Sequence, residues 1–166
     1  MILMPFLVKA QQDPMISQYM FTGLVLNPAY AGSHEFTNAT ALYRYQWANV
    51  STDNGTDGWN PWTFVATVDG KIQSSNLAWG VILGNDQYGP SSKNDVIANF
   101  GYHLPVGNGK LSVGLRGGMS FYNADLNTLN NLSNDPAFQT NASNAVLGNF
   151  GAGVYYYSKK FYAGVS

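Results

Sequence analysis

The sequence has 166 residues and a net charge of -1, with 10% charged residues, 14% aromatic residues and 18 glycines. Soluble globular domains carry about 25% charged residues, so this composition predicts that much of the surface does not face water. The charge shows no basic stripe, which excludes nucleic acid as an expected partner. The absence of cysteine excludes a disulfide scaffold.

The composition also bears on how the chain could cross a membrane. No apolar run approaches the roughly 20 residues that a membrane-spanning helix needs. The other structure that crosses a bilayer is a closed β-barrel, whose strands alternate apolar and polar side chains and keep the mean hydropathy near zero. The mean hydropathy of -0.14 fits this pattern. The composition therefore favours an all-β fold, an antiparallel transmembrane barrel.

The N-terminus has features of a secretory signal peptide. Residues 2–8 form a short apolar core, and Val8-Lys9-Ala10 reads as a cleavage site before polar Gln11. The basic leader that normally precedes such a core is missing. We therefore expect residues 1–10 to be the remnant of a signal peptide; an ordinary buried strand is the alternative.

Residues 11–37 are predicted to form an N-terminal plug that the later strands surround. The stretch 17–33 is apolar enough to need burial, but glycine and proline interrupt any helical or strand period. Pro28 cannot donate to a strand ladder and pushes Asn27 out of the α region, so residues 27–32 should form a fixed turn. The predicted plug residues are Asn27, Pro28, Ala29, Tyr30 and Gly32.

Seven later segments alternate apolar and polar side chains with a period of two, which predicts β-strands. These segments are 38–47, 62–71, 77–84, 95–105, 111–123, 145–158 and 161–166. We assign the bulky apolar positions to a lipid-facing side, including Tyr45, Phe64, Val81, Phe100 and Phe150. The opposite faces would line the lumen, with the polar positions Arg44, Gln46, Asn99, His103 and Arg116.

The connections between these segments are predicted to alternate long and short, as in outer-membrane barrels with external loops and periplasmic turns. The long connections are 49–60, 85–94 and 124–144, and the last is predicted to meet exported partners. The short turns carry Lys71, Lys110, Lys159 and Lys160, which predicts a basic periplasmic rim. The alternative is that connections are polar in any protein.

Seven strands do not close a bacterial barrel, which normally has an even number of strands. An unpaired edge at 161–166 would be a site of aggregation. We therefore expect the natural chain to continue, with residues 38–166 forming the first half of a β-barrel.

No constellation for catalysis or metal binding is found in the sequence. His34 and His103 lack ligand spacing around them. The segment 53–58 resembles a calcium loop, but Phe64 stands where the twelfth, acidic position should be. A glycine-rich turn at 107–111 lacks the remaining residues of a phosphate loop. We predict a protein that is not an enzyme and has no cofactor or metal.

Three ordered motifs resemble the start of the PorP/SprF family. They are Gln12-Asp13-Pro14 followed by Ser17-Gln18-Tyr19-Met20, then Leu26-Asn27-Pro28-Ala29-Tyr30-Ala31-Gly32, then Tyr43-Arg44-Tyr45-Gln46-Trp47. The resemblance implies an outer-membrane barrel of about fourteen strands in a Gram-negative bacterium, associated with type IX secretion and gliding. It also implies partners: outer-membrane lipid, the periplasmic ring of the secretion machinery, and exported adhesin-like or C-terminal-signal-bearing proteins.

Two other functions remain open at this point. The Asn27-Pro28-Ala29 turn is also similar to the lumen hatch of FadL-type transporters of hydrophobic molecules, although the inward faces here are mostly Gly, Ser, Thr and Asn. A soluble β-sandwich that binds glycans through its tryptophans is the second alternative. That fold needs the aromatic faces to be buried between two sheets.

Overall fold

The computed structural model of the chain describes residues 21–34, 36–46, 60–124 and 144–166. They form one seven-stranded antiparallel sheet in which each strand pairs with its neighbours in the sequence. The elements are α1 (Gly23–Leu26), the 3-10 helix η2 (Pro28–Tyr30), β1 (Asn38–Tyr45), β2 (Trp62–Lys71), β3 (Leu77–Tyr88), β4 (Ser91–Val106), β5 (Gly109–Ala124), β6 (Ala145–Ser158) and β7 (Tyr162–Val165).

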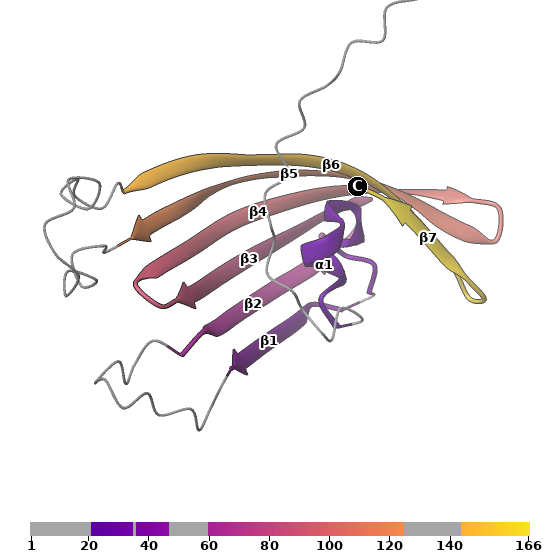
Figure 1. Ribbon diagram of the computed structural model, residues 1–166. Coiled ribbons are helices and arrows are strands. Elements are labelled where there is room, and N and C mark those ends of the chain that lie inside the picture. Colours follow the sequence, from indigo (N-terminus) through magenta and orange to yellow (C-terminus); the bar gives the residue numbers. More distant parts are fainter. Residues whose placement is uncertain (1–20, 35, 47–59, 125–143) are drawn as a thin grey trace, which may run out of the picture.

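The sheet curls into part of a barrel, and α1 lies on its concave side (Figure 1). β4 and β5 have 16 residues each, which exceeds the roughly 9–11 residues that a transmembrane strand needs. The expected all-β partial barrel is therefore confirmed. Among the described residues, no helix combines the length and the apolarity needed to cross a bilayer.

Burial follows the alternation that the sequence predicts. In β2, Thr63, Val65, Thr67 and Asp69 are buried, whereas Phe64 and Val68 between them are exposed. The buried members of β2, β3 and β4 lie on the concave side, since they are the ones that contact the N-terminal segment. This burial pattern agrees with the alternation read from the sequence, since a two-residue period puts successive side chains on opposite faces of a strand.

The convex side exposes the bulky apolar residues. Phe100, Leu115 and Phe150 are 65%, 62% and 83% exposed, and Tyr45, Phe64 and Val81 are also exposed. A glycan-binding sandwich requires the aromatic side chains of this face to be buried under a second sheet. Their exposure contradicts that alternative.

One predicted connection is wrong. Residues 85–94 were expected to form a long loop, but β3 continues to Tyr88 and β4 begins at Ser91, so only Gly89 and Pro90 connect them. The polar residues of the stretch pair across the ladder, as Asp86 does with Lys93. These polar residues belong to the ends of the two strands, beyond the apolar band, and not to a loop. The predicted alternation of long and short connections therefore fails at this position.

Several predictions lie outside the described residues. They are the signal-peptide remnant at 1–10, residues 11–20 of the predicted plug, nearly all of the predicted connections 49–60 and 124–144, and the tryptophans at positions 47 and 59. The strand predicted at 38–47 ends at Tyr45, and the one predicted at 161–166 covers Tyr162–Val165.

The hydrophobic core lies between the N-terminal segment, which we define as residues 21–34, and the concave side of the sheet. Leu24 and Ala31 of this segment pack with four buried residues of β2 to β4. The four are Val65, Ala78, Ile82 and Ile97. The sheet thus buries its concave face against its own chain and leaves its convex face without cover from the described residues.

Candidate functional site

The candidate site is the contact between the N-terminal segment and the concave face, and it is built on a turn at Asn27. Asn27 has an extended backbone (φ -140°, ψ 121°), as expected for a residue that precedes proline. Its side-chain Oδ1 accepts a hydrogen bond from the backbone N–H of Ala29 at 2.8 Å. This bond caps the 3-10 helix that Pro28 begins. The turn is therefore specified by its own residues.

A row of small residues crosses the sheet beneath this turn. The pairing places Ala78, Gly101, Gly114 and Gly153 side by side on β3, β4, β5 and β6. A Cβ atom added at Gly114 would overlap the backbone of Pro28 and Ala29, and one added at Gly153 would overlap the side chain of Asn27. The absence of side chains at these positions lets the turn touch the sheet backbone directly.

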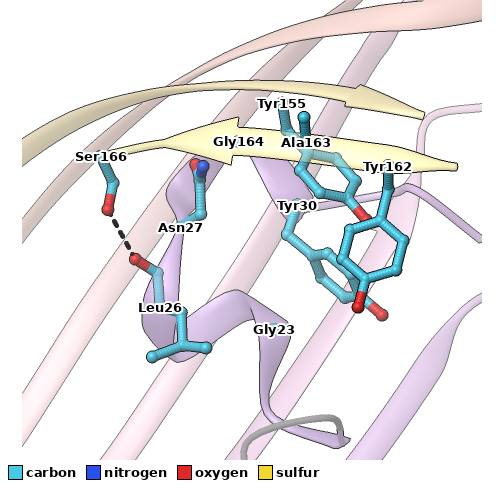
Figure 2. A pocket seen from close by; sticks show the side chains of 9 residues that line it. All are labelled: Gly23, Leu26, Asn27, Tyr30, Tyr155, Tyr162, Ala163, Gly164 and Ser166. Carbon is cyan, nitrogen blue, oxygen red and sulfur yellow. Dashed lines mark hydrogen bonds between the residues drawn. The ribbon is translucent and has the colours of Figure 1, made fainter.

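Asn27 also joins the segment to the last two strands. Its Nδ2 donates to the carbonyl oxygens of Val154 at 3.1 Å and Val165 at 3.3 Å, in β6 and β7. Ser166 donates from its hydroxyl to the carbonyl oxygen of Leu26 at 2.9 Å (Figure 2). The side chain of Asn27 thus caps the turn and also hydrogen-bonds to two strands that lie more than a hundred residues later in the sequence.

Arg116 of β5 binds the end of α1. Its Nη2 donates to the carbonyl oxygens of Leu24 at 2.6 Å and Val25 at 2.8 Å, while its Nε donates to Asn99 Oδ1 at 3.0 Å. The last carbonyls of a helix have no partner within the helix. A cation that donates to them satisfies these groups and gives the stronger, charge-assisted kind of hydrogen bond.

Two further side chains hold the turn at its other end. His103 Nε2 lies 2.9 Å from the carbonyl oxygen of Ala31, so this nitrogen carries the proton, since a carbonyl oxygen only accepts. Asp69 accepts from the backbone N–H of Gly32 through its Oδ2 at 2.9 Å. Gly32 has a φ of 65°, a left-handed conformation that suits glycine.

A cavity of about 480 Å³ lies between the segment and the β6–β7 pair (Figure 2). The rings of Tyr30, Tyr155 and Tyr162 gather on one side of it, with Tyr30 and Tyr155 centroids 5.5 Å apart. The Tyr30 hydroxyl is hydrogen-bonded to His34 Nε2 at 3.1 Å. Burial raises the pKa of Tyr30 above its usual value, so the hydroxyl remains neutral.

The predicted site residues fall into two groups in the structure. The predicted plug residues all lie in the N-terminal segment, and Asn99, His103 and Arg116 lie beneath it. Arg44 and Gln46 lie together at the far end of β1. With its amide oxygen turned toward the guanidinium, Gln46 accepts from Arg44 Nε at 2.9 Å.

Sequence reasoning missed Asp69 and the row of small residues as parts of this site. The signal for the row was present, because glycine recurs on the inward faces of successive predicted strands. Within the described ranges, His, Cys, Asp and Glu side chains do not gather in threes as a metal site would require. The arrangement is suited to holding a segment of chain by shape and by hydrogen bonds.

A curved antiparallel sheet with an exposed apolar outer face, and with polar and small residues on an inner face that its own N-terminal segment covers, defines the class of β-barrel membrane proteins. Residues 8–166 match the family described as type IX secretion system membrane protein PorP/SprF. The chain belongs to the PorP/SprF family, as its sequence motifs predicted, and is a membrane component of type IX secretion. No curated protein and no solved structure shows significant similarity to it.

Proposed function

We propose that this chain is a non-enzymatic component of the outer membrane that helps proteins exported by type IX secretion to pass through, or attach to, the cell surface. The observation that carries this proposal is the family match over residues 8–166. The exposed apolar convex face supports a position in lipid, since outer-membrane barrels carry an apolar band on the outside.

The sheet would be part of a closed barrel in the membrane. β1 and β7 each pair with a strand on one side only, so both have a free edge in the described sheet. Unpaired backbone groups are too costly in hydrocarbon for open sheet edges to exist there. The free edges of β1 and β7 would therefore pair with further strands in the bilayer.

The N-terminal segment would act as the plug of this barrel. It binds the concave face through Asn27, and through Arg116 and His103 of the sheet. In this proposal the segment closes the lumen to small solutes. Arg116 and His103 then act by holding the segment, while Arg44 and Gln46 line the part of the lumen that the segment does not reach.

The proposed partners are outer-membrane lipid, the periplasmic ring of the secretion machinery, and exported proteins that are adhesin-like or bear a C-terminal secretion signal. The test is a deletion strain of the native host that expresses a fluorescent protein fused to such a signal. We expect the reporter to remain in the periplasm and to reach the surface again when the wild-type gene is restored. Normal export in the deletion strain would contradict the proposal.

A second experiment tests the plug. Residues 27–32 are replaced by a Gly/Ser linker of the same length in the full-length chain, which is then reconstituted in planar bilayers. We expect higher single-channel conductance than for the wild type, whereas Tyr30→Phe, which keeps the shape of the turn, should leave conductance unchanged. Equal conductance for the linker variant and the wild type would remove the plug from the proposal.

A further inference from the structure

The short-turn end of the sheet carries a set of lysines. They lie at the end of β2, at the start of β5 and between β6 and β7, at Lys71, Lys110, Lys159 and Lys160. Asp69, the acidic residue of β2 at this end, is 1% exposed and is bonded to Gly32. The exposed charge of these turns is therefore positive.

One of these turns borders a cavity of about 680 Å³. The cavity lies between the β4–β5 turn and the β6–β7 turn, and is lined by Asn108, Tyr156, Ser158, Lys159, Lys160 and Phe161. Ser158 fixes the turn, since its hydroxyl donates to the carbonyl oxygen of Phe161 at 3.1 Å and accepts from the N–H of Phe161 at 3.3 Å. The two adjacent lysines are thus held on a defined turn.

The aromatic side of this cavity continues into the convex face. The rings of Tyr156 and Phe161 lie 5.4 Å apart, and Phe161 is 60% exposed. Tyr156 shares its face of β6 with the exposed Val154, two residues before it. Cationic, aromatic and aliphatic groups therefore follow one another from the turn along the strand.

We propose that this cavity binds the headgroup of an anionic phospholipid, with Lys159 and Lys160 on the phosphate and the acyl chains along the convex face. The inference rests on the proposed position in the membrane. Basic pockets at the ends of membrane-spanning elements bind lipid phosphates, and aromatic rings lie at the headgroup level. An acidic protein would match the lysines but would have no use for the apolar surface that adjoins them.

The test uses the full-length chain purified in detergent and native mass spectrometry with phosphatidylglycerol or phosphatidylcholine as the probe. The variant Lys159→Gln/Lys160→Gln removes both charges at the cavity. The matched control Lys71→Gln/Lys110→Gln removes two charges from the same end of the sheet but outside the cavity lining. Soluble glycerol phosphate serves as a competitor without acyl chains.

We expect the wild type to prefer phosphatidylglycerol, the cavity variant to bind it about tenfold or more weakly, and the control to change less than about twofold. Equal losses in both variants, equal binding of the two lipids, or full displacement by glycerol phosphate would each overturn the inference. Sedimentation with vesicles distinguishes a failure of the lipid-binding inference from a failure of the proposed membrane position. A chain that does not sediment with vesicles contradicts both proposals, whereas a chain that does so without lipid preference contradicts only this one.

Discussion

Arg116 and Leu24 are 92 positions apart in the chain, yet the guanidinium of Arg116 donates to the carbonyl oxygen of Leu24 over 2.6 Å. The bond joins the middle of the sheet to α1, a helix too short to supply partners for the carbonyl oxygens of Leu24 and Val25 from within. It shows that the concave face holds a segment of its own chain.

Replacing Arg116 by Met should loosen the N-terminal segment. The loss of hydrogen bonds from a charged donor, at about 1.5–3 kcal/mol, should speed amide hydrogen exchange at Asn27 and Tyr30 by roughly 10- to 100-fold. Both amides are bonded within the segment. The matched control is Arg44→Met at the far end of β1, for which exchange at these amides should be unchanged. Equal exchange in the two variants would contradict the role of Arg116.

Adding a methyl group beneath the turn should displace it. A Cβ at Gly114 would meet the backbone of Pro28 and Ala29, which cannot rotate away, so Gly114→Ala should cost about 1–3 kcal/mol. Gly117→Ala in the same strand is the control, since the nearest atom to its Cβ is in Phe150 at 4.0 Å. Urea unfolding in detergent measures both. Similar midpoints for the two variants would argue against a close contact at Gly114.

The two roles of Asn27 can be separated by substitution. Asn27→Asp keeps an oxygen for the N–H of Ala29 but places a carboxylate against the carbonyl oxygens of Val154 and Val165. We expect faster amide exchange in β7 for Asn27→Asp than for Asn27→Ala, because buried unpaired charge costs more than a lost bond. The excess should shrink at acidic pH, where the introduced carboxyl gains a proton to donate. Slower exchange in the Asp variant would mean that these carbonyls do not face Asn27.

Arginine substitutions on the convex face can distinguish a surface that faces lipid from one that faces water. Leu115 lies in the middle of β5 and is 62% exposed, so in a bilayer Leu115→Arg should cost about 2–4 kcal/mol of stability. Val106→Arg, at the end of β4, should cost about 0–1 kcal/mol because it lies near the interface. Urea unfolding from lipid vesicles measures the difference. On a surface that faces water, both variants would stay within about 0.5 kcal/mol of the wild type.

The strands were largely predictable because their signal is local. The bounds of β2 and β6 agree with the alternation read from the sequence, since each residue's facing follows from its neighbours in the strand. The error at 85–94 has a local cause too: polar residues at strand ends have the composition of a loop.

The candidate site was only partly predictable because its contacts depend on register. Gly114 and Gly153 become neighbours only through the β5–β6 pairing. The sequence around these two glycines gives no sign that Pro28 packs against both of them. Arg116 shows the same limit: the sequence predicts that its side chain lines the lumen, but not what it binds there. Its facing could be read from the strand period, but its partner in α1 could not.

The central claim is that the convex face of this sheet meets lipid, and spin-label accessibility tests it most directly. Since the sequence has no cysteine, a single nitroxide can be attached at Phe100→Cys or Leu115→Cys, with Gln73→Cys in the exposed β2–β3 turn as the aqueous reference. In vesicles, we expect the two convex labels to be relaxed by oxygen and shielded from a water-soluble nickel chelate, and the turn label to show the opposite. Convex labels as accessible to the nickel chelate as the turn label would contradict the account.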